Sequence, residues 1–209
     1  ELKNNIVVST LNGTGTTSSG DIEIGMKNST ISGNRINKLG VSGAIFVGVV
    51  GCSFYGNVFD KFIFRNIVWR TDGTTLSSSS NILDNEKINE FASLSLSSDT
   101  TIRNSTINKY SQSITYNMNI SNTKIGIYAN NLAEESNTTF YACEIEEMSI
   151  LNNTELTRIH ISHSKINKLS SSLSSFFTID KSDIYPSVQI YGNANSVFNN
   201  SNIHSTVGA

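Results

Sequence analysis

The sequence predicts an all-β fold: a single-stranded right-handed parallel β-helix of about eleven rungs, each roughly nineteen residues long. Three observations predict it. A short pattern recurs about every nineteen residues, each copy begins with an apolar residue that another follows five positions later, and asparagine and small polar residues concentrate between the two.

The composition of the 209 residues agrees with this fold. Serine, asparagine and threonine account for 79 residues, and charged residues for only 15%, against about 25% in an average globular protein. Such a composition also occurs in disordered chains. Here, 25 isoleucines and 17 phenylalanines and tyrosines favour strands instead. The net charge of −2 excludes the basic surface on which nucleic-acid binding depends.

No targeting or membrane segment is evident in the chain. No apolar run approaches the about 18 residues of a membrane-spanning helix, so no membrane insertion is expected. The first residues do not form a signal peptide, and the chain does not begin with methionine. We expect residues 1–209 to form one domain that is a fragment of a longer chain.

The repeat is anchored by one apolar residue in each rung. The predicted anchors are Ile6, Met26, Val49, Phe64, Leu83, Ile102, Ile120, Phe140, Ile161, Ile179 and Phe198. The residues five positions later are Leu11, Ile31, Phe54, Trp69, Ile88, Ile107, Ile125, Ile145, Ile166, Ile184 and Ile203. All of these second residues are apolar, which predicts two buried columns, one on each of two strands per rung.

Between the two apolar columns lies a predicted bend. Six rungs place asparagine two residues after the anchor, where it can adopt a left-handed backbone: Asn28, Asn66, Asn85, Asn104, Asn122 and Asn200. A small residue follows and is expected to face inward: Ser9, Ser29, Cys52, Ser105, Thr123, Cys143, Ser164, Ser182 and Ser201. This register separates the two cysteines by five rungs, or roughly 24 Å at about 4.8 Å per rung. They are therefore expected to be buried free thiols, because a disulfide needs Cα atoms within about 7 Å.

The main alternative is a left-handed helix of hexapeptides. Its apolar residues would recur every six positions, whereas here the two apolar residues are five apart and the rung length varies. No glycine-rich calcium-binding repeat is present either. The right-handed form is therefore the predicted one.

An asparagine column at a bend, followed by a small residue and isoleucine, resembles the asparagine-ladder turn of right-handed parallel β-helices. That group includes pectate-lyase-like polysaccharide enzymes and bacteriophage tailspikes and appendages. The resemblance covers nearly the whole chain but contains no catalytic motif. It implies a serine-, threonine- and asparagine-rich homotrimer in which further sequence or neighbouring subunits cover the raw ends of the helix.

Acidic residues suggest a glycosidase, because sugar cleavage uses two carboxylates. Glu144 and Asp183, two rungs apart in one column, are the first candidates; the weaker ones near a turn are Glu146, Glu147 and Glu155. Charge alternation favours stacked ion pairs over catalysis. One column reads Lys87, Thr106, Lys124, Glu144, Lys165 and Asp183, and another reads Glu90, Lys109, Ile127, Glu147 and Lys168.

Short rungs also leave little chain for the walls of a cleft. The longest connections, 32–48 and 70–82, are where a cleft within one chain is expected. A groove between subunits of a trimer is the alternative.

Exposed aromatic rings are the second carbohydrate signal. Tyr55, Tyr141 and Tyr185 are predicted to face outward and could bind sugars or pack in a trimer. Tyr110, Tyr128 and Trp69 are predicted to lie in the core.

The histidines His160, His163 and His204 have no partners at metal-ligand spacing, so neither a metal site nor a cofactor is expected. His163 occupies the asparagine position of its rung and is expected to substitute for it.

Three functions fit these features. The favoured one is a structural and receptor-binding segment of a bacteriophage tail spike or appendage that recognises bacterial surface polysaccharide, located on the virion tail outside the cell. The second is a tailspike-type depolymerase, either a glycoside hydrolase or a polysaccharide lyase. The third is a bacterial or archaeal surface adhesin.

Overall fold

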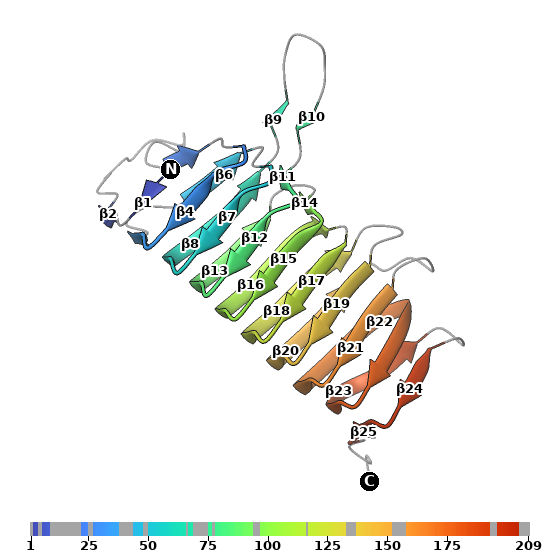
Figure 1. The fold of residues 1–209 in the computed structure, drawn as a ribbon. Coiled ribbons are helices and arrows are strands. Elements are labelled where there is room, and N and C mark those ends of the chain that lie inside the picture. The colour runs from blue at the N-terminus through green and yellow to red at the C-terminus, as the bar shows by residue number, and fades with distance from the viewer. Residues whose placement is uncertain are drawn as a thin grey trace, which may run out of the picture.

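A computed structural model shows an all-strand parallel β-helix (Figure 1). It describes residues 2–3, 6–8, 22–24, 27–37, 44–47, 50–65, 67–68, 75–76, 78–93, 97–115, 117–132, 137–151, 158–192 and 196–204. Every element within these ranges is a strand, and none is a helix that could cross a membrane. The right-handed sense of the coil stays a prediction.

The first sheet is a row of parallel strands, one from each rung. In stacking order it contains β1 (Leu2–Lys3), β4 (Thr30–Ser32), β7 (Ser53–Tyr55), β12 (Ile82–Asp84), β15 (Thr100–Arg103), β17 (Met118–Ser121), β19 (Asn137–Tyr141), β21 (Arg158–Ser162), the second half of β22 (Lys165–Asp180) and β24 (Val197–Asn199). These are ten strands among the described residues, so the turn count differs from the predicted eleven.

The second sheet follows a bend in each rung. It contains β2 (Ile6–Val8), β3 (Ile22–Ile24), β5 (Arg35–Asn37), β6 (Ala44–Val47), β8 (Val58–Arg65), β11 (Ser78–Ser79), β13 (Lys87–Ser93), β14 (Ser97–Ser98), β16 (Thr106–Thr115), β18 (Lys124–Leu132), β20 (Glu144–Leu151), the first half of β22, β23 (Asp183–Gly192) and β25 (Asn202–Ile203). A separate antiparallel pair, β9 (Ile67–Val68) and β10 (Thr75–Leu76), projects from the side of the stack (Figure 1).

The predicted register is confirmed from Leu83 to Ile203. Strand pairing aligns every predicted anchor from Leu83 to Phe198, and every second residue from Ile88 to Ile203.

The register predicted for the first rungs is wrong. Ile31 and Phe54 lie in the first column, aligned with Leu83, and not in the second. Ile6 pairs with Arg35 in the second sheet, and Phe64 pairs with Phe46 and Ser93, so neither is an anchor. Met26, Val49, Leu11 and Trp69 lie outside the described residues. A search for asparagine at the bend missed these rungs because Gly33 and Gly56 occupy it there, each with a positive φ.

Two columns of left-handed residues turn the chain. The bend between the first and second sheets has φ values of 46–64° at Gly33, Gly56, Asn85, Asn104, Asn122, Ala142, His163, Lys181 and Asn200. The bend that enters the first sheet has φ values of 37–63° at Asn28, Gly51, Ser80, Asp99 and Asn117. The predicted left-handed asparagines are therefore confirmed at Asn85, Asn104, Asn122 and Asn200. Asn28 belongs to the other bend, and Asn66 lies outside the described residues.

A buried polar ladder follows the first bend. In this ladder the backbone N–H of one residue donates to the side chain of the ladder residue one rung later, over 2.9–3.4 Å. These bonds run from Asn34 to Thr123, and again from Cys143 to Ser201. Thr123 and Cys143 occupy neighbouring rungs, which are joined by the bond from the Glu144 N–H to the Thr123 carbonyl at 3.1 Å. The ladder consists of Asn34, Asn57, Glu86, Ser105, Thr123, Cys143, Ser164, Ser182 and Ser201.

Each hydroxyl of the ladder also donates to the carbonyl two residues earlier in its own rung, as Ser164 Oγ does to Ser162 at 2.8 Å. The same bond forms at Ser105, Thr123, Ser182 and Ser201. Because each hydroxyl both accepts and donates, these buried groups are satisfied.

The two cysteines are buried and free, as predicted. Cys143 occupies a ladder position and bonds through sulfur to the Tyr141 carbonyl at 3.4 Å. Cys52 lies instead at the other bend, where its N–H donates to Asn81 Oδ1. The prediction that both share one column is therefore wrong, because Cys52 precedes a strand of the first sheet and Cys143 one of the second.

The interior is filled by columns of stacked apolar side chains. Phe62, Phe91, Tyr110 and Tyr128 form a continuous ring stack with centroids 4.7–5.2 Å apart. The core positions predicted for Tyr110 and Tyr128 are confirmed, since both side chains are fully buried. In the last described rung Phe198 is 46% exposed, although Ile179 below it is fully buried. Burial therefore depends on a neighbouring rung on each side.

Glu86 is the carboxylic acid among the described ladder residues. Its Oε1 accepts from the backbone and side chain of Asn57, while its buried Oε2 has no hydrogen-bond partner among the described residues. Burial raises the pKa of this carboxyl to about 8; bonds from Asn57 lower it, and the nearby Asp84 raises it further. Glu86 is therefore mostly neutral at pH 7 in the folded protein.

We expect the protein to lose stability as pH rises from about 4.5 to about 8. The folded state retains a proton on Glu86 that the unfolded state has released, so the unfolding free energy falls by up to about 1.4 kcal/mol per pH unit. Urea unfolding of wild type and Glu86→Gln across this range measures the effect. The glutamine variant should lose this slope, whereas the exposed control Glu144→Gln should keep it; equal slopes in wild type and Glu86→Gln would contradict the assignment.

Candidate functional site

An open groove of about 610 Å³ follows the first bend in the C-terminal half of the chain. Three parallel columns line it. The bend contributes Ala142, His163, Lys181 and Asn200, the ladder contributes Cys143, Ser164 and Ser182, and the strands that follow contribute Glu144, Lys165, Asp183 and Asn202.

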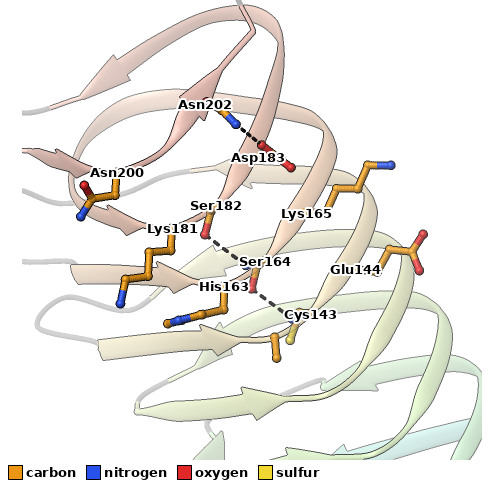
Figure 2. A pocket seen from close by; sticks show the side chains of 11 residues that line it. Cys143, Glu144, His163, Ser164, Lys165, Lys181, Ser182, Asp183, Asn200 and Asn202 are labelled. Atoms are coloured by element: carbon orange, nitrogen blue, oxygen red, sulfur yellow. Dashed lines mark hydrogen bonds between the residues drawn. The ribbon is translucent and has the colours of Figure 1, made fainter.

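Side chains leave the two sides of the groove in different directions. Figure 2 shows His163, Lys181 and Asn200 projecting on one side of the ladder, and Glu144, Lys165 and Asp183 on the other. The ladder between them is held by bonds from Cys143 to Ser164 and from Ser164 to Ser182. The groove therefore has a row of polar side chains on each side of the hydrogen-bonded ladder.

The first candidate carboxylates lie in the predicted column. Register pairs Glu144 with Lys165, and Lys165 with Asp183, so a lysine position separates the two acids. Glu144 forms an ion pair with Lys124 at 3.3 Å, and Asp183 accepts from the Asn202 amide at 2.8 Å. Both acids thus line one groove, but each is bound to a different neighbour.

The weaker carboxylate candidates also have partners in the next rung. Glu147 forms an ion pair with Lys168 at 3.0 Å, and Glu146 accepts from the Asn167 amide at 2.7 Å. Glu90 of the same predicted column forms an ion pair with Lys61 at 3.5 Å. The predicted ion-pair ladder is therefore present at these rungs. Glu155 lies outside the described residues.

All three candidate tyrosines are exposed as predicted: Tyr55 by 56%, Tyr141 by 48% and Tyr185 by 37%. The ring of Tyr185 stacks on His204 with centroids 4.1 Å apart, and Tyr141 lies 5.2 Å from His163 at a tilted angle. Tyr141 directly precedes the groove residue Ala142, and Tyr185 follows Asp183 by two residues. Neither tyrosine lines the groove itself. Tyr141 adjoins it through its contact with the lining residue His163, and Tyr185 through its position on β23, which begins at the lining residue Asp183.

Tyr55 lies in the same outward column as Tyr141, four register steps away. It lines neither the groove nor a second surface hollow. The second hollow, of about 380 Å³, is bordered by Asp60, Asn89 and Asn108. Neither hollow includes residues of 32–48 or 70–82, where the sequence predicts a cleft.

Two of the histidines, His163 and His204, contact the rings of the candidate tyrosines. His163 occupies the left-handed bend position with a φ of 51°, which confirms that it substitutes for asparagine. Among the described residues, no three histidine, cysteine or acidic side chains are placed to hold a metal ion. The neighbouring Cys143 is buried, which raises the pKa of its thiol and keeps it protonated at neutral pH.

Sequence reasoning missed Lys181 and Asn202 as groove residues. Each could have been found by its rung position: Lys181 stands two residues after the anchor Ile179, as His163 does after Ile161, and Asn202 continues the column of Asp183. Neither Lys165 nor Lys181 has an acidic partner within ion-pair distance in the described parts of the chain.

Comparison with protein-family models, with curated proteins and with solved structures found no match.

Replacing Ser164 by alanine should destabilise the protein by about 1–3 kcal/mol, because the buried N–H of Cys143 loses its acceptor. Ser164→Cys should restore much of the loss, since Cys143 already fills a ladder position with sulfur. Urea denaturation measures both variants. The half-buried outward residue Ser162 provides the control: Ser162→Ala should change stability by less than about 0.5 kcal/mol. Equal effects of the two alanine variants would show that the ladder bond contributes little.

Proposed function

We propose that the chain is a structural and receptor-binding segment of a bacteriophage tail spike or appendage that recognises bacterial surface polysaccharide. The observation that carries this proposal is the pair of exposed tyrosines beside an open polar groove. Tyr141 and Tyr185 each lie against a histidine ring, His163 and His204, which limits the movement of the tyrosine rings.

The chemistry of the groove suits a sugar polymer. Flat aromatic faces contact the apolar C–H faces of sugar rings, and polar side chains bind hydroxyls. The groove provides lysine and histidine side chains, carboxylates and the amides of Asn200 and Asn202. Because it is open along the stack, a chain can lie in it without threading.

The elongated shape supports a fibre-like role. Strands stack in one direction from β1 to β24 (Figure 1), and each rung adds about 4.8 Å to the length. As in the proteins that the sequence resembles, we propose a homotrimer located on the virion tail, outside the cell. Size-exclusion chromatography with light scattering tests this state, and a monomer would favour the adhesin alternative.

A depolymerase is the second candidate, because Glu144 and Asp183 line the same groove. Their separate partners, Lys124 and Asn202, argue for binding over cleavage.

Incubating the chain with a panel of bacterial capsules and lipopolysaccharides tests both functions. We expect binding without release of reducing ends or unsaturated sugars. Tyr141→Ala with Tyr185→Ala should weaken binding on the order of tenfold or more, since each ring contact contributes about 0.5–1.5 kcal/mol. Tyr55→Ala is the matched control and should bind normally.

Release of sugar products that Glu144→Gln or Asp183→Asn abolishes would establish the depolymerase instead. If every glycan fails to bind, the receptor-binding proposal is wrong.

A further inference from the structure

The second sheet has a corner at which two successive residues face outward in each rung from β8 to the first half of β22. The burial pattern shows it in β13, where Asn89 and Glu90 lie outside between the buried Ile88 and Phe91. Two adjacent outward rows therefore follow this corner. The first contains Asp60, Asn89, Asn108, Gly126, Glu146, Asn167 and Tyr185, and the second contains Lys61, Glu90, Lys109, Ile127, Glu147 and Lys168.

In most rungs the side chains of these rows form hydrogen bonds or ion pairs with the next residue of the same row. Along the first row, Asn89 donates to Asp60 at 3.0 Å, Asn108 to Asn89 at 3.1 Å, and Asn167 to Glu146 at 2.7 Å. Along the second row, Lys61 pairs with Glu90, and Lys168 with Glu147. Stacked polar partners of this kind hold exposed side chains in place.

One rung interrupts both rows. Its residues are Gly126 and Ile127. A Cβ at Gly126 would lie 2.4 Å from the carbonyl oxygen of Asn108, so the close approach of the two backbones requires glycine. Ile127 is 42% exposed where its neighbours in the row are Lys109 and Glu147.

The interruption leaves hydrogen-bonding groups on both sides. Asn108 donates to Asn89, and among the described residues its Oδ1 accepts no bond. Lys109 has no acid within ion-pair distance in the same ranges, because Glu90 pairs with Lys61. Glu146 uses Oε2 for Asn167, and its other oxygen faces no described donor.

We propose that this interruption, the corner notch formed by Asn108, Lys109, Gly126, Ile127 and Glu146, is a subsite for one uncharged, hydroxyl-rich sugar ring of an extended polysaccharide. The inference rests on the proposed function and adds a second site to it. Ile127 contacts the apolar face of the ring, Lys109 donates to hydroxyls, and Asn108 and Glu146 accept from them. Groups of both charges disfavour a strongly acidic or basic ligand.

The position of the notch connects two other features. Asn108 also borders the 380 Å³ hollow, and the first row continues past Glu146 and Asn167 to Tyr185 beside the groove. The rung spacing of about 4.8 Å is close to the length of one pyranose in an extended chain. A polymer lying along the corner therefore passes the notch about three rungs, or roughly 14 Å, before Tyr185.

A subunit contact is the competing explanation for an exposed isoleucine. A stable interface buries about 800 Å² per partner around an apolar centre. At the notch the apolar contribution is one side chain, flanked by a cation and a carboxylate, which fits a sugar ring better.

The test uses the full chain and a polysaccharide, lipopolysaccharide O-chain released by mild acid, separated into long chains and fragments of one to three sugars. We expect Ile127→Asn and Asn108→Ala each to weaken long-chain binding about fivefold to tenfold while leaving short-fragment binding at Tyr185 within about twofold of wild type. Backbone NMR shifts at Gly126 should move with long chains in wild type.

Matched controls lie on the first sheet. Ile82 is 38% exposed and Asn119 is exposed, so Ile82→Ser and Asn119→Ala remove equivalent groups away from the corner. Both should bind like wild type.

If wild type binds long chains and the Ile127 and Asn108 variants bind them equally well, the proposal of a sugar subsite at the notch is wrong, while the proposed function still stands. A change of oligomeric state in Ile127→Asn without loss of glycan affinity overturns it in favour of a subunit contact. Failure of wild type to bind any chain overturns both.

Discussion

The hydrogen bond from one rung to the side chain of the next is the interaction on which this fold depends. A left-handed residue precedes each ladder residue, and the N–H of the ladder residue donates to a side chain of the next rung instead of to a strand carbonyl. A buried N–H without an acceptor costs about 1–3 kcal/mol. The ladder from Asn34 to Ser201 supplies that acceptor at most described rungs, so the bend, the sharp corner and the packed core occur together.

This constraint explains in which parts of the sequence the repeat could be recognised. From Leu83 onward, serine, threonine or cysteine fills most ladder positions and asparagine many bends, so the repeat is visible in the residue types. In the first rungs Asn34 and Asn57 fill the same positions with longer side chains, and glycine replaces asparagine at the bend. The physical role is conserved between rungs while the residue type changes, and a pattern of residue types misplaced Ile31 and Phe54 for this reason.

The candidate site was predictable in part. Alternating charges along a column identified the neighbours of Glu144 and Asp183, because residues one rung apart become adjacent in a parallel stack. The outward tyrosines followed from strand alternation. The corner of the second sheet did not, since two successive outward residues break the period of two. The significance of Gly126 also depends on the approach of the Asn108 carbonyl, a backbone distance that no sequence pattern contains.

The ladder has a consequence for how such a molecule can change over generations. Each ladder residue contacts only the rungs directly before and after it, so stability is close to a sum of nearest-neighbour terms. Duplication or deletion of one complete rung would leave the remaining contacts intact and alter the length of the outer rows by a single step. A protein built this way can change its own length by recombination, one rung at a time, without redesigning any individual contact.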